Sequence, residues 1–215
     1  MDLIQESFER LYPNKAFDYA AEIVYTGRFK PFNANIRKTH DKITLNLSKS
    51  WKNVDKEIVI GLIQELLVKL FKSKKNTSNM EMYNSYIKNL HKYTPKTRSD
   101  PILESSFHRV NLSYFDGMID IPNLKLGQKS VSSLGSYSYA TDTITISSAL
   151  LHDLELVDYV MYHELLHKKH QFKSKNGRSR HHTTQFRKDE KAFPNSELME
   201  KRLSRLRVKK FLRLI

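Results

Sequence analysis

A pattern of strand, helix, loop and proline occurs twice in this chain, and it limits the folds that the chain can adopt. In the first half, an alternating apolar segment from Lys42 to Leu47 is followed by the helical segment Gln64-Glu65-Leu-Leu-Val68. In the second half, Thr143 to Ser148 is followed by His163-Glu164-Leu-Leu-His167, with the two helical motifs 99 residues apart. A lysine-rich loop and a proline, Pro95 and then Pro194, follow each helix. Because the elements recur in the same order, we interpret the chain as a duplicated unit.

The periodicity of apolar residues predicts an α+β fold for each half. Each half contains a helix, two or three strands and then two helices, which we expect to form a small antiparallel or mixed sheet packed on the motif helix. We place the first copy at residues 1–98 and the second at residues 99–215. In the second copy, helices are expected near 102–110, 148–153, 156–172, 184–192 and 197–214, with strands near 117–127, 132–139 and 142–147.

The segment from Val157 to His170 carries the residues with the clearest chemistry. On a helix, His163 and His167 lie four residues apart on one face, so both imidazoles can bind one cation. Glu164 lies next to the first of them and can act as a general base on a water molecule at the metal. Six of the nine histidines fall between residues 152 and 182, which favours a metal site over an ordinary amphipathic helix.

A third ligand must come from outside this helix. His170 is about 10 Å further along the helix axis than His163, which is too far for one zinc ion with bonds of about 2 Å. The chain has no cysteine, so thiolate ligands are excluded. His181 and His182 follow a loop that can turn the chain back, and the sequence leaves the choice between them open.

The second half resembles the SprT-like zinc metallopeptidases over roughly residues 104–195. The resemblance rests on H-E-L-L-H at 163–167, on His182 followed four residues later by Phe186, and on the later pair Phe193-Pro194. It implies a zinc peptidase with His163, His167 and His182 as ligands and Glu164 as the catalytic base. Phe186 favours His182 over His181. The chain departs from the family at Thr183, where glycine or serine is usual.

The first copy is predicted to bind no metal. At the same spacing, Gln64, Val68 and Tyr83 stand opposite the three expected ligands, and only Glu65 keeps its counterpart. Residues 1–98 are therefore interpreted as a degenerate, metal-free copy of the peptidase-like unit.

Composition is compatible with a cytoplasmic protein. The chain has no basic and apolar leader at its start and no apolar run near 18 residues, so we expect neither a secretory signal nor a membrane span. The absence of cysteine fits a reducing compartment. A location at the nucleoid or nucleus is an alternative, because the net charge is +14.

The charge is concentrated after the metal motif, where residues 168–215 carry a net charge of +12. Residues 1–98 carry +8 and residues 99–167 carry −6. A basic segment of this kind can bind the phosphates of DNA or RNA, or can simply be a solvated surface. The candidate contacts are on the last predicted helix: Arg205, Arg207, Lys209 and Lys210.

Two functions follow from these observations. The first is a zinc endopeptidase that hydrolyses protein or peptide substrates, including proteins associated with nucleic acid. The alternative is a nucleic-acid-binding protein whose zinc site is structural or vestigial. A structural site is usually closed by four protein ligands, whereas a catalytic site has three, so the number of ligands separates the two.

Overall fold

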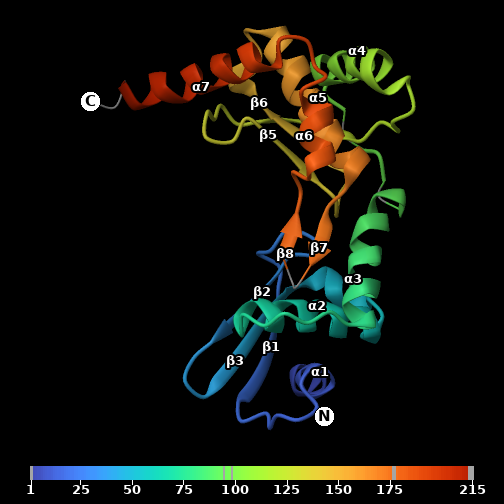
Figure 1. Cartoon of the computed structure of the whole chain (residues 1–215), viewed down its shortest axis with the longest axis vertical. Helices are drawn as coiled ribbons and strands as arrows, with labels where there is room; N and C mark the ends of the chain where they lie inside the picture. The colour runs from blue at the N-terminus through green and yellow to red at the C-terminus, as the bar shows by residue number, and fades with distance from the viewer. Residues whose placement is uncertain (1, 94, 98, 176–177, 213–215) are drawn as a thin grey trace. The chain divides into compact units, whose positions relative to one another are not determined.

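The protein divides into two compact units. The structure, a computed structural model, describes residues 2–93, 95–97, 99–175 and 178–212 (Figure 1). The first unit comprises Met1–Leu90 with Lys173–Arg180, and the second comprises His91–Phe172 with His181–Ile215. The division in sequence thus lies close to the predicted boundary at residues 98 and 99, and the segment 173–180 goes with the first unit.

The first unit contains one three-stranded sheet with helices. Its elements are α1 (Leu3–Leu11), β1 (Ala20–Thr26), β2 (Ala34–Lys38), β3 (Lys42–Ser48), the 3-10 helix η1 (Lys49–Asn53), α2 (Lys56–Leu70), α3 (Ser78–Asn89) and the hairpin strands β7 (Lys173–Lys175) and β8 (Arg178–Arg180). A second 3-10 helix, η2 (Leu90–Tyr93), lies where the two units meet in sequence.

The second unit repeats this order of elements. It contains α4 (Pro101–Phe115), β4 (Asn123–Gly127), β5 (Gly135–Ser138), β6 (Thr143–Ser147), the 3-10 helix η3 (Ser148–Leu150), α5 (Leu154–His170), α6 (Thr184–Glu190) and α7 (Ser196–Leu212). The α+β class and the small mixed sheets predicted from the sequence are confirmed.

The two three-stranded sheets have the same topology. The strand orders are β1-β3-β2 and β4-β6-β5, so the third strand of each unit is central. In both sheets the central strand is parallel to the first strand and antiparallel to the second. The free edges of β2 and β5 therefore occupy corresponding places in the two units.

The core of the second unit lies between its sheet and its helices. Ile144 and Ile146 alternate along β6 and are buried, as expected for a strand with one covered face. Helix α5 packs against α4, β5 and β6. The apolar residues that cover its buried face include Val157, Val160, Met161, Leu165 and Leu166.

Some element boundaries differ from those predicted. Helix α4 extends to Phe115, and β4 begins only at Asn123, because Ile119 and Ile121 pack on the core without pairing in the sheet. Within the segment predicted as a loop, β7 and β8 pair as antiparallel strands. No helix in the described parts of the chain is long and apolar enough to cross a membrane.

Candidate metal centre

Helix α5 supplies two of the three histidines of the site. Asp153 caps its first turn, with a side-chain oxygen accepting the N–H of Leu156 at 3.3 Å. The helix then buries its apolar face and leaves His163 and His167 half-buried on its surface. Their spacing of four residues brings the two rings to 4.9 Å between centroids.

His182 reaches the same place from the segment before α6. Thr183 caps that helix by accepting the N–H of Phe186 at 3.2 Å, so His182 immediately precedes the helical turn. Phe186 is fully buried, and its ring lies 4.7 Å from the His167 ring and 4.8 Å from the His182 ring. This aromatic ring packs against both imidazoles and so restricts their orientation.

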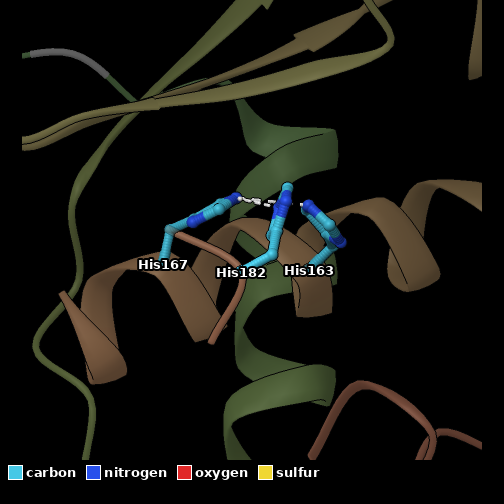
Figure 2. Close-up of side chains that lie close together, drawn as sticks. All are labelled: His163, His167 and His182. Carbon is cyan, nitrogen blue, oxygen red and sulfur yellow. Dashed lines mark hydrogen bonds between the residues drawn. The ribbon is translucent and has the colours of Figure 1, made fainter. Parts of the chain in front are cut away.

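The three imidazoles converge through their Nε2 atoms (Figure 2). The His167 Nε2 atom lies 3.2 Å from that of His163 and 3.3 Å from that of His182. Two nitrogens bound to one tetrahedral zinc ion at about 2.0–2.1 Å are about 3.3–3.4 Å apart. The distances from His167 Nε2 to the Nε2 atoms of His163 and His182 therefore fit a zinc ion without rearrangement.

The outer nitrogen of His163 is held by a carboxylate. His163 Nδ1 lies 2.7 Å from Glu190 Oε1, on the last residue of α6. This contact places the proton on Nδ1 and leaves Nε2 free to bind a metal. Burial lowers the pKa of His163, but the hydrogen bond to Glu190 and the nearby acidic groups together raise it above its usual value.

The other two imidazoles are disposed to stay neutral. Burial and the neighbouring histidines lower the pKa of His167 to about 3, and burial also lowers the pKa of His182. Neutral imidazoles keep the lone pair that a metal requires. The Nδ1 atom of His167 is buried and has no hydrogen-bond partner among the described residues, in contrast to the Nδ1 of His163.

Glu164 lies next to this group and is 5% exposed. Burial raises the pKa of its carboxyl group to about 7, while the charge of His163 and the backbone N–H of Tyr137 act to lower it. A carboxylate with a pKa near the working pH can both accept and release a proton. The arrangement thus places a proton-transfer group beside the three nitrogens.

Gly135, the first residue of β5, allows strand and helix to approach closely. A Cβ atom at this position would lie 2.5 Å from Glu164 Oε1 and 2.6 Å from Val160 Cγ1. No side chain larger than hydrogen fits there unless the helix or the carboxylate moves. The carboxylate is therefore positioned against the backbone of the edge strand.

The two remaining nearby histidines lie outside the group of three. His170 Nε2 lies 2.8 Å from Asp189 Oδ2, as expected for a residue too far along the helix to share the metal. His181 lies among the rings of Tyr139 and Phe172, with ring centroids 5.8 Å away in each case. Among the described residues, the group that can hold a metal consists of His163, His167 and His182.

The residues at the corresponding positions of the first unit are engaged in other contacts. The Glu65 carboxylate accepts from Lys69 at 3.3 Å and from Asn84 at 3.1 Å. Gln64 Oε1 accepts the Thr77 hydroxyl at 2.5 Å. Gln64, at the position of the first ligand, and Glu65, at the position of the base, thus both have polar partners inside the first unit.

Several residues of the site carry no signal in the sequence. Gly135, Tyr137 and Glu190 come from other elements, and only the fold brings them to Glu164 and His163. For the predicted nucleic-acid contacts, the structure describes the side chain of Arg205, which is exposed. The side chains of Arg207, Lys209 and Lys210 lie outside the described residues.

The sequence matches no protein-family model and no curated protein. Among solved structures, the chain is similar to the crystal structure of the metallopeptidase zymogen jannalysin of Methanocaldococcus jannaschii. The two are 18% identical with a TM-score of 0.37, and the match covers 55% of this chain and 100% of that chain.

We predict that His182→Ala removes zinc from the chain, whereas His181→Ala keeps it. The reason is that the Nε2 of His182 meets that of His167, while His181 packs among aromatic rings. Metal analysis of both variants after dialysis against zinc checks this. Full zinc content in His182→Ala together with loss in His181→Ala would contradict the ligand set.

We also predict that Glu190→Gln weakens zinc binding without abolishing it. The Gln side chain cannot accept from His163 Nδ1 with a full negative charge, and loss of such an outer partner typically costs about 10–100-fold in metal affinity. Competition with a chelator of known affinity measures the change. Glu104→Gln on helix α4, whose carboxylate accepts the Ser99 hydroxyl at 2.6 Å, is the control and should bind zinc as the wild type does.

Proposed function

We propose that this chain is a zinc-dependent endopeptidase of the SprT-like type. In this proposal His163, His167 and His182 hold Zn²⁺ and Glu164 is the catalytic base. The observation that carries the proposal is the convergence of three imidazoles beside a buried carboxylate, with the Nε2 atoms of His167 and each of its two partners at the spacing of a tetrahedral site.

The number of ligands supports a catalytic rather than a structural site. A closed structural site uses four protein ligands, and a catalytic one uses three and leaves a position for water or substrate. The group in the described part of the chain has three members, and His170 and His181 have other neighbours. The open position is what a hydrolase needs.

Glu164 is suited to proton transfer during peptide hydrolysis. A bound zinc ion would supply Lewis acidity, which activates water and polarises the carbonyl group of a peptide bond. Glu164 accepts the proton from the attacking water and then donates it to the nitrogen of the leaving amine. Its pKa of about 7 balances these two tasks near neutral pH.

The free edge of β5 offers a place for an extended peptide. Ser147 N donates to Leu134 O at 2.9 Å, and hydrogen-bonded pairs alternate along an antiparallel ladder. In the register of β5 with β6, Gly135 and Tyr137 therefore direct their backbone groups away from β6. A substrate strand can add to this edge by β-augmentation, which places its backbone next to Glu164.

The two units are proposed to be copies of one ancestral unit. Supporting observations are the shared order of elements and the shared strand topology. Ala34 pairs with Leu47 in β3 just as Gly135 pairs with Ile146 in β6. The first copy thus carries a Cβ where the second has the glycine that faces the catalytic carboxylate, which agrees with a unit that has lost the activity. We assign residues 1–98 to the degenerate copy and 99–215 to the catalytic one.

The contact of α7 with DNA or RNA stays a prediction. The reason for this prediction is the net charge of +12 on residues 168–215. Only one of the four candidate side chains, that of Arg205, lies within the described residues.

The test of the proposal is the substitution Glu164→Gln. It removes the base and leaves the three histidines, so cleavage of an unfolded protein by the zinc-loaded chain should fall by about 10²–10⁴-fold while zinc stays bound. Glu104→Gln, an identical exchange on helix α4, should leave cleavage unchanged. Undiminished cleavage by Glu164→Gln would remove this residue from the mechanism.

A further inference from the structure

Asp142 is a fully buried acidic residue in the turn between β5 and β6, with 0% of its surface exposed. Its backbone is left-handed, with φ 39°, a conformation that aspartate and asparagine tolerate better than most residues. A carboxylate at this depth is stable only with close polar partners. The partners of Asp142 therefore indicate which segments the turn holds together.

Three side chains from different segments meet this carboxylate. The Tyr137 hydroxyl donates to Oδ1 at 2.7 Å, and Lys168 Nζ donates to the two oxygens at 2.9 and 2.7 Å. Lys96, from the segment before α4, makes a further ion pair with Oδ2. The Lys168 side chain is itself only 8% exposed, so its charge depends on Asp142.

These contacts tie the edge strand to the motif helix. Tyr137 lies on β5, and Lys168 is the residue after the proposed ligand His167 on α5. Asp142 bridges the two side chains and so limits sliding of strand and helix past each other. The Tyr139 hydroxyl adds a second link nearby by donating to the His167 carbonyl oxygen at 3.1 Å.

Tyr137 also contacts the proposed base directly through its backbone. The Tyr137 N–H is among the groups that act to lower the pKa of Glu164, and the backbone of β5 lies against this carboxylate at Gly135, while the Tyr137 hydroxyl is anchored on Asp142. The same residue therefore has one end on Glu164 and the other on the buried carboxylate. A change at Asp142 is transmitted to Glu164 through a single side chain.

We propose that Asp142 and Tyr137 are positioning residues that hold the Glu164 carboxylate in its reactive place. Asp142 fixes the Tyr137 side chain relative to Lys168, and Tyr137 in turn directs its N–H at Glu164. The inference rests on the proposed function, because it names residues that support the base of that reaction. The side chains of Asp142 and Tyr137 are not expected to touch the substrate or the metal.

The variants that test this proposal are Tyr137→Phe and Asp142→Asn. Tyr137→Phe removes only the hydroxyl, and Asp142→Asn removes the charge without straining the left-handed backbone. Tyr159→Phe is the matched control, since that buried tyrosine also donates to a carboxylate, Glu200 Oε1 at 2.7 Å, but has no contact with Glu164. Tyr137→Phe and Tyr159→Phe each lose one hydrogen bond from a tyrosine hydroxyl to a carboxylate.

The first readout is kinetic. We expect Tyr137→Phe and Asp142→Asn to lower kcat about 10–100-fold, as misplacement of a catalytic group does, with KM and zinc content unchanged. The double variant should be little worse than either single one, because both act through the same link. Tyr159→Phe should keep the wild-type kcat even if its melting temperature falls equally.

The second readout is amide hydrogen exchange at residue 137, which does not depend on activity. Exchange there should be at least about tenfold faster in both variants than in the wild type, with Gly135 on the same strand as reference. Wild-type kcat and wild-type exchange in Tyr137→Phe would overturn the proposal. If the wild-type chain cleaves nothing but exchange still accelerates, the peptidase proposal fails and the positioning of Glu164 is supported.

Discussion

The close approach of strand β5 to helix α5 is the constraint on which the site depends. It is possible because residue 135 is glycine. A Cβ atom at this position would collide with Glu164 and Val160. This contact buries the carboxylate, raises its pKa, and sets it against the backbone of an edge strand. On the same helix, His163 directly precedes Glu164, and His167 lies about one turn after His163. The proposed general base, the proposed metal-binding pair and the proposed peptide-binding edge are thus positioned by one packing contact.

The imidazoles are held by two kinds of interaction that act together. Packing on Phe186 orients the rings of His167 and His182, and Glu190 fixes the proton of His163 on its outer nitrogen. The Nε2 atoms of His167 and His163 lie 3.2 Å apart, and those of His182 and His167 lie 3.3 Å apart. At these separations each pair can share a proton as a hydrogen bond, and all three imidazoles can bind one cation as proposed.

Local sequence pattern was sufficient to predict the helix that carries His163 and His167 and the strand that became β6. The resemblance to the SprT-like family favoured His182, because Phe186 follows it four residues later, and the structure packs that ring against the histidine. The sequence could not predict Glu190, which meets His163 across 27 residues, or Gly135, whose role depends on a helix that follows later in the chain. Contacts of this kind arise from tertiary packing and leave no periodic trace. The hairpin β7–β8 was missed for a different reason, since its lysines, arginines and serines lack the apolar alternation that marks a strand.

The two units also share features that the proposed duplication predicts. The paired motifs at 64–68 and 163–167 predicted a shared order of elements, and both units have that order and the same strand topology. The difference between them is chemical. In the first unit, Glu65 is satisfied by Lys69 and Asn84, whereas in the second unit Glu164 faces imidazoles and a strand edge.

The most direct test of the central claim is X-ray absorption spectroscopy of the zinc-loaded chain. The account predicts a four-coordinate ion with three imidazole nitrogens at about 2.0–2.1 Å and one light-atom ligand that exchanges with solvent or inhibitor. His163→Ala should lose this spectrum. A shell of four imidazoles, or zinc bound without any imidazole from this group, would contradict a catalytic centre built on His163, His167 and His182.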